Sequence, residues 1–159
     1  MSAASASPLR PCFHLAFPVD DLERARKFYA GALGCSLGPS TEGSQAFDWQ
    51  GHQLVAILSR RALSVTEADV DGLTVPDFHF GLIVEWADFG PLLERLRDHG
   101  VPLLIEPDLP YPDHRPNATP AAPADQRRLL VRDPSGNTLE FKAYRRSAGE
   151  AGMQPSPPC

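Results

Sequence analysis

The chain has 159 residues, of which 42% are hydrophobic, and its 15 basic and 20 acidic side chains give a net charge of −5. This composition excludes a wholly disordered chain and favours a single compact domain. A net negative charge, without a basic run longer than a pair such as Arg60-Arg61, argues against nucleic acid as a partner. The apolar stretches are much shorter than the roughly 20 residues that a membrane span needs, so we expect no membrane partner.

The two ends of the chain are predicted to lie outside the folded core. Residues 1–11 and 146–159 are rich in Ser, Ala, Gly and Pro, a composition typical of disordered tails. The first residues lack the charged leader and apolar core of a secretory signal, which predicts a cytoplasmic protein. The three cysteines, Cys12, Cys35 and Cys159, share no CxxC spacing, so we interpret them as reduced thiols without a function.

The first half of the chain predicts a strand, a helix and then further strands. Phe13-His14 opens an alternating or apolar run over residues 13–19, which predicts a strand. A helix is expected next, with Asp20 and Glu23 at capping-box spacing and Gly34 at its end. An Asp-x-x-Gly turn over residues 48–51 then leads into another strand.

The second half repeats this order. A strand is predicted over residues 78–86, followed by a helix that is capped by Asp88 and ends at Gly100. A second Asp-x-x-Gly turn, at residues 133–136, again precedes a strand. Two related modules, 12–60 and 77–145, are therefore expected, each with a strand, a helix and about three further strands. The two halves share few identical residues, so chance similarity is the alternative to a true duplication.

The two halves differ in length by a proline-rich insert. The Phe-His pairs that open the halves lie 65 residues apart, whereas the Asp-x-x-Gly turns lie 85 apart. The difference is close to the length of the segment 107–123, where prolines remove backbone donors and forbid a helix or a central strand. We expect a long loop there, either a lid over a pocket or a disordered segment.

Strand alternation places three possible metal ligands on particular faces. His14 shares a face with Ala16 and Pro18, His79 with Gly81 and Ile83, and Glu140 with Thr138 and Lys142. Taken singly, a strand histidine is more often a hydrogen-bonded core or rim residue, and a strand glutamate usually faces solvent. Together, two histidines at matching points of a repeat and one carboxylate form a ligand set that leaves about three positions of an octahedral ion open.

These segments resemble the vicinal oxygen chelate superfamily, which includes glyoxalases, bleomycin- and fosfomycin-resistance proteins and extradiol dioxygenases. The resemblance covers Phe13 to Arg145 and rests on four segments, residues 13–29, 51–56, 78–81 and 133–142. It implies an α+β fold of two βαβββ modules that form one open-barrel cleft. It also implies a divalent metal held by His14, His79 and Glu140, and a homodimer that in some members exchanges modules.

Departures from the family pattern narrow the chemistry. Glyoxalase-type members use a fourth protein ligand at the position of Val55, which has no ligating atom. Many relatives have a histidine where Ile57 stands, and Ile57 cannot take over a hydrogen-bonding role of that histidine. A set of three ligands resembles the ring-cleaving dioxygenases, with Fe(II) or Mn(II) favoured and Zn or Ni as alternatives.

Other candidates surround this predicted centre. Tyr144 has the strand parity of Glu140 and is the best phenolic candidate, and His52 is either a second catalytic candidate or a structural turn residue. Tyr111 and His114 on the proline-rich insert are candidates for closing over a substrate. We expect three further residues to be structural: His99 at a helix end, and Trp49 and Phe47 in the core.

The function that follows is a metal-dependent enzyme whose small-molecule substrate chelates the ion through two neighbouring oxygens. Ligand count favours a dioxygenase. The alternatives are a glyoxalase-like lyase or isomerase, and a non-catalytic binding protein of the bleomycin-resistance kind. A purely structural dimer module fits less well, because it gives no reason for metal-ligating side chains on one strand face.

Overall fold

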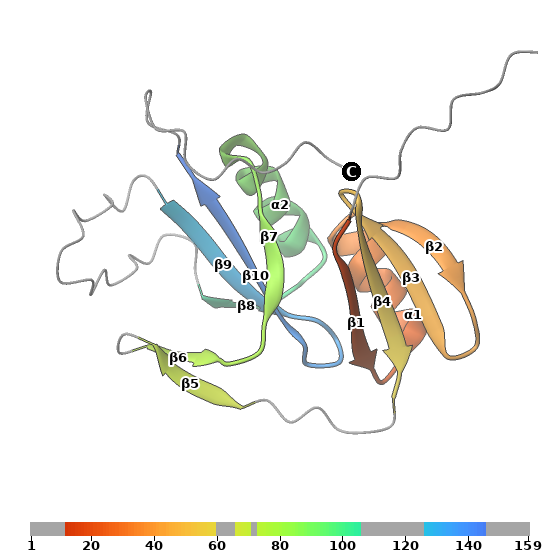
Figure 1. Ribbon diagram of the computed structural model, residues 1–159. Coiled ribbons are helices and arrows are strands. Elements are labelled where there is room, and N and C mark those ends of the chain that lie inside the picture. Colours follow the sequence, from red (N-terminus) through yellow and green to blue (C-terminus); the bar gives the residue numbers. More distant parts are fainter. Residues whose placement is uncertain (1–11, 60–65, 71–72, 106–125, 146–159) are drawn as a thin grey trace, which may run out of the picture.

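The computed structural model describes residues 12–59, 66–70, 73–105 and 126–145. These residues form two four-stranded sheets, and a helical region lies beside each sheet (Figure 1). The first half contains β1 (His14–Val19), α1 (Leu22–Arg26), the π-helix η1 (Lys27–Ala32), β2 (Ser36–Ser40), β3 (Ser44–Trp49) and β4 (His52–Leu58). The second half contains β7 (Phe80–Ile83), α2 (Trp86–Asp98), β8 (Leu103–Ile105), β9 (Gln126–Arg132) and β10 (Thr138–Tyr144).

The two sheets have the same topology, which confirms the expected βαβββ repeat. Their strand orders are β1-β4-β3-β2 and β7-β10-β9-β8, and in each the first strand runs parallel to the last. The register also repeats: Ala16 pairs with Val55 in the first sheet, and Gly81 pairs with Glu140 in the second. The offsets of 65 and 85 residues therefore join structurally equivalent positions.

One hydrophobic core joins the two halves. Phe17 of β1 lies 5.2 Å from Phe80 of β7, and Trp49 of β3 lies 5.6 Å from Phe141 of β10, both between ring centroids. Phe17, Trp49 and Phe141 belong to a single buried cluster that also includes residues of both helices, and the partly buried Phe80 packs against it. Trp49 and Phe47 are buried within it, so the expectation that they pack in the core is confirmed.

The helices differ in detail from the sequence expectation. The N-cap of α1 is Asp21, not Asp20, and its carboxylate accepts hydrogen bonds from the backbone amides of Glu23 and Arg24. These bonds lower the pKa of Asp21. The wider turn of η1 brings Phe28 and Tyr29 into the core together.

The second helix also begins earlier than expected. α2 starts at Trp86 with Glu85 as N-cap, and Asp88 lies within its first turn instead of capping it. Gly34 and Gly100 follow the two helical segments with positive φ angles of 75° and 66°, as their predicted role requires.

An additional hairpin lies between the halves. β5 (Glu67–Val70) and β6 (Leu73–Pro76) pair with each other and with neither large sheet, and the repeat had not indicated them. The strand expected over residues 78–86 is shorter and begins at Phe80. The two predicted tails and the insert 107–123, with Tyr111 and His114, lie outside the described residues. Among those that are described, no helix is long and apolar enough to cross a membrane.

Candidate metal centre

The predicted ligands lie on the sheet face that does not carry the main core. In each strand, core positions such as Phe17 and Phe141 alternate with a second set of positions that point the other way. We call this second face the outer face. In the first sheet its central members are His14, Ala16, Pro18, Gln53, Val55 and Ile57; in the second they are Gly81, Ile83, Arg128, Leu130, Glu140 and Lys142.

His79 and Glu140 come together on the second sheet. The Nε2 atom of His79 lies 3.4 Å from Oε2 of Glu140, and the glutamate side chain is only 11% exposed. His79 stands just before β7, and its Nδ1 lies 2.9 Å from the carbonyl oxygen of Pro76 at the end of β6. The hairpin that the repeat had not indicated thus orients this imidazole.

Lys142 completes this group. Its Nζ atom lies 2.8 Å from the same Oε2 atom of Glu140, and its side chain is one-third exposed. Lys142 follows Glu140 by two residues and therefore shares its face. The parity of Glu140 and Lys142 is visible in the sequence, whereas their contact appears only in the structure.

His14 has a similar environment at the other module. It lies at the start of β1, is exposed, and its Nδ1 is 2.7 Å from Oε1 of its register partner Gln53. Each imidazole therefore has an oxygen acceptor at Nδ1. In the neutral tautomer with the proton on Nδ1, Nε2 keeps its lone pair, which is the arrangement typical of histidines that bind a metal. The chemistry of the donors fits a divalent ion in this respect.

The structure does not bring His14 to His79 and Glu140 within one chain. β1 and β7 are edge strands that meet through Phe17 and Phe80, and they run in opposite directions (Figure 1). His14 begins β1 and His79 precedes β7, so the two histidines lie at opposite ends of this strand pair. A strand of six residues spans about 20 Å. Within the described part of the chain, no three His, Cys, Asp or Glu residues lie close enough to share an ion.

A glycine allows the backbone of β7 to approach Glu140. A Cβ atom at Gly81 would overlap the backbone carbonyl oxygen of Glu140, its register partner. No side chain fits at this point without a shift of one strand. Gly81 therefore helps to fix the position of the carboxylate.

The remaining sequence candidates occupy different places. Val55 is the register equivalent of Glu140 in the first sheet and gives that sheet no ligand there, and Ile57 beside it is exposed. Tyr144 lies on the outer face at the end of β10 and is 45% exposed. His52 has the opposite parity to Val55, and its Nδ1 accepts a hydrogen bond from the backbone amide of Phe13. This bond supports the structural reading of His52.

His99 has the structural contact expected of a helix end. Its Nδ1 lies 2.8 Å from the carbonyl oxygen of Arg95, one turn earlier in the same helix. The buried Cys35 is also inert, because desolvation raises the pKa of its thiol to about 12. Cys12 is exposed, and neither thiol forms a disulfide.

The turn that precedes β10 joins the two modules. Asp133 is buried and accepts hydrogen bonds from the Tyr29 hydroxyl, at 2.9 Å, and from the Asn137 side chain, at 2.7 Å. Asn137 also donates to the carbonyl oxygen of Pro18 in β1. Burial raises the pKa of Asp133 despite these donors, and burial together with the Asp133 charge raises that of Tyr29. The first half of the segment 133–142, which resembles the family motif, is thus structural, and its second half contains Glu140 and Lys142.

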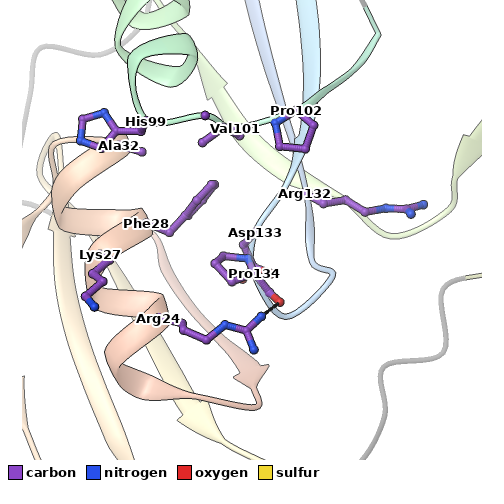
Figure 2. A pocket seen from close by; sticks show the side chains of 11 residues that line it. Arg24, Lys27, Phe28, Ala32, His99, Val101, Pro102, Arg132, Asp133 and Pro134 are labelled. Carbon is purple, nitrogen blue, oxygen red and sulfur yellow. Dashed lines mark hydrogen bonds between the residues drawn. The ribbon is translucent and has the colours of Figure 1, made fainter.

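A separate cavity of about 460 Å³ lies behind this turn (Figure 2). Figure 2 shows Arg24 and Phe28 from the first helical segments pointing toward the Asp133-Pro134 turn and the Val101-Pro102 segment. Lys27 also lines the cavity, but its side chain points away from the turn. The Arg24 guanidinium donates to the carbonyl oxygen of Pro134. The predicted metal ligands do not line this cavity, so we do not identify it with the metal centre.

Comparison with known proteins identifies the fold family. Residues 12–141 match the model of the Glyoxalase/Bleomycin resistance protein/Dioxygenase superfamily. The chain belongs to this superfamily. The search of curated proteins found no match for this chain.

Several solved structures share the fold. A glyoxalase/bleomycin resistance protein/dioxygenase from Alicyclobacillus acidocaldarius is 28% identical, with a TM-score of 0.65 over 84% of this chain and 91% of that one. The fosfomycin resistance protein FosX from Listeria monocytogenes is 15% identical, with a TM-score of 0.62 over 85% and 93%. A lactoylglutathione lyase from Agrobacterium tumefaciens is 16% identical, with a TM-score of 0.55 over 86% and 96%. The last two likenesses concern the fold alone.

Proposed function

We propose that this superfamily member is a metal-dependent enzyme that acts on a small molecule able to chelate a divalent ion through two neighbouring oxygens. The observation that carries the proposal is the approach of the His79 imidazole to the Glu140 carboxylate, with Nδ1 of His79 directed at a backbone oxygen. This leaves the lone pair of Nε2 toward the carboxylate, where a cation is favoured.

His14 is the third ligand, and we propose that it comes from a second copy of the chain. His14 and His79 occupy equivalent positions of the repeat, at the start of β1 and just before β7. Within one chain, however, they lie at opposite ends of the pair formed by β1 and β7, because these strands run in opposite directions. In a two-fold symmetric dimer, the start of β1 in one chain would lie beside the start of β7 in the other. The symmetry would create two such sites per dimer.

Two exposed phenylalanines support such a pairing. Phe13 and Phe78 occupy equivalent positions of the repeat, directly before His14 and His79, and are 61% and 60% exposed. Large apolar side chains exposed beside a predicted ligand are typical of an interface. Ile57 and Ile83 on the outer faces of the two sheets are also partly exposed, at 44% and 45%.

The chain's own residues would bind and orient the substrate. A divalent ion supplies Lewis acidity to the chelating oxygens and stabilises the negative charge that develops on them. Gln53 and the Pro76 carbonyl hold the two imidazoles, and Gly81 fixes the backbone at Glu140. Three protein ligands leave about three positions for substrate, water or oxygen.

The Val55 position favours a dioxygenase as the reaction class. It is the register equivalent of Glu140 and adds no fourth ligand, which leaves room on Fe(II) or Mn(II) for both a chelating substrate and oxygen. Anaerobic Fe(II) loading followed by a panel of catechols in air tests this assignment. A new yellow ring-cleavage absorbance is expected, whereas its absence with every catechol would move the assignment to a lyase or isomerase on Zn or Ni.

Elemental analysis tests the metal centre itself. Freshly purified protein is expected to contain close to one divalent ion per chain, and Glu140→Ala is expected to remove it. Glu94→Gln, which changes an exposed glutamate on α2, is the control and should keep the metal. Equal metal content in wild type and Glu140→Ala would reject the site, and a folded wild type without metal would favour the binding-protein alternative.

A mixing experiment tests the second copy. His14→Ala and Glu140→Ala chains are unfolded together and refolded, so that half of the dimers contain one chain of each kind. Each mixed dimer would have one complete site and one site that keeps only His79, which restores about one quarter of the wild-type metal. Separate refolding should restore none. No recovery in the mixture, while His14→Ala alone lacks metal, would place all three ligands in one chain.

A further inference from the structure

The outer face of the second sheet contains a pair of cations that the metal centre does not explain. Lys142 of β10 and Arg128 of β9 are direct register partners on this face, next to Glu140. Arg128 is buried, with 6% of its surface exposed, and Lys142 is one-third exposed. Like charges directly opposite each other on neighbouring strands repel, so each of these cations needs a partner of its own.

Glu140 is the acidic partner that the structure shows for Lys142. Its Oε2 atom faces both Nζ of Lys142, at 2.8 Å, and Nε2 of His79, at 3.4 Å. Any cation bound through this carboxylate would compete with Lys142 for the same oxygen. Lys142 would then lose its counter-ion and would face Arg128 with a second positive charge nearby.

The equivalent place in the first sheet has no charge. The repeat matches Lys142 with Ile57, and the register partner of Ile57 on β3 is Ser44. The two modules share their topology and register, so the fold itself does not require a cationic pair at this point. The pair is a property of the side that also contains His79 and Glu140.

We propose that Lys142 and Arg128 form an anion subsite beside the metal ligands, so that the substrate carries a carboxylate or a phosphate-type group next to its chelating oxygens. This inference rests on the proposed function for the place of the chelating oxygens. The anion takes the position at Lys142 that Glu140 occupies in the absence of a bound cation. Ammonium and guanidinium groups recognise both kinds of oxyanion through charge-assisted hydrogen bonds.

The first test requires no metal. Glu140→Gln removes the carboxylate that occupies Lys142, and we expect metal-free Glu140→Gln protein to bind benzoate or inorganic phosphate about tenfold more tightly than metal-free wild type. Adding Lys142→Met to this variant should abolish the gain. Lys27→Met in the same background removes an exposed lysine of the other module and should leave the gain intact.

The outcomes of this titration, followed by calorimetry or by NMR shifts, are decisive for the subsite alone. A gain that Lys142→Met removes supports it, and comparison of benzoate with phosphate shows which oxyanion it prefers. No gain in Glu140→Gln, or a gain that survives Lys142→Met, would overturn it. Since no metal is present, neither result depends on the proposed function.

The second test uses metal-loaded protein and two related chelators. Catechol and 3,4-dihydroxybenzoate offer the same pair of oxygens, but only the latter adds a carboxylate. Wild type should prefer 3,4-dihydroxybenzoate by about tenfold, and Lys142→Met should bind the two chelators alike. Arg128→Lys keeps the charge in the buried position and should retain part of the preference.

The two tests separate the two proposals. Protein that binds neither metal nor catechol contradicts the proposed function and leaves the metal-free titration to decide the subsite. Protein that binds metal and both chelators equally, with no effect of Lys142→Met, contradicts the subsite and leaves the metal centre in place.

Discussion

The two sheets have one topology and two different outer faces. At equivalent register positions the first sheet has Ala16 and Val55, whereas the second has Gly81 and Glu140. The first face contains His14, Gln53, Ser44 and Asp48 among apolar residues, and the second combines an imidazole, a carboxylate and two cations. In the proposed metal centre the second module would therefore supply two ligands, His79 and Glu140, and the first would supply His14.

The two Asp-x-x-Gly turns differ in the same way. Asp48 is exposed and accepts a hydrogen bond from the backbone amide of Gly51, at 3.1 Å. Asp133 is buried and accepts hydrogen bonds from the neighbouring module as well as from its own turn. One sequence pattern thus forms a simple turn in the first half and a junction between modules in the second.

Replacing each aspartate by alanine should give the largest difference in stability. Asp133→Ala leaves the buried Tyr29 hydroxyl and the Asn137 amide without their acceptor, which should lower the free energy of unfolding by about 3 kcal/mol. Asp48→Ala should cost less than about 1 kcal/mol, because its partner can bond to water. Urea denaturation measures both, and similar costs would show that the two turns are equivalent after all.

A single added methyl group should distinguish the two parallel strand pairs. Gly81→Ala forces β7 away from Glu140 and should cost about 2–3 kcal/mol of overpacking strain, with weaker metal retention at Glu140. The reverse change at the equivalent site, Ala16→Gly, should cost about 0.5–1 kcal/mol through backbone entropy alone. A Gly81→Ala variant with wild-type stability and metal content would mean that the strand pair adapts freely.

The residue after each helix-ending glycine should affect a labelling rate rather than the stability of the protein. Cys35 follows Gly34 in the first module, as Val101 follows Gly100 in the second, and its pKa of about 12 keeps the thiol neutral. In a Cys12→Ser/Cys159→Ser background, this thiol should react with a disulfide reagent roughly a thousandfold more slowly than in urea-unfolded protein, since the thiolate is the reactive form. Rapid labelling of the native variant would show that Cys35 is not packed as Val101 is.

Most of the fold was predictable because its signals are local. The strand alternation of residues 13–19, the positive-φ glycines 34 and 100 and the paired Asp-x-x-Gly turns depend on neighbouring residues, and the structure confirms them. The caps were less predictable. Asp20 and Asp21 both suit an N-cap, and only the backbone angles select Asp21.

The candidate site was predictable in part. Parity alone placed Glu140 and Lys142 on one face, and the repeat paired His14 with His79. The contact between His79 and Pro76 was not predictable, because it depends on the hairpin β5-β6, which has no counterpart in the repeat. The contact between His14 and Gln53 depends on the register of β1 against β4.

The sequence by itself determined which side chains share a strand face and which positions of the two halves correspond, since a strand turns over every second residue whatever surrounds it. Only the tertiary structure decided where the two halves stand relative to each other. Packing of Phe17 on Phe80 and of Trp49 on Phe141 sets β1 and β7 in opposite directions, and so separates His14 from His79 and Glu140. That arrangement results from many distant contacts acting together, and no local pattern in the chain encodes it.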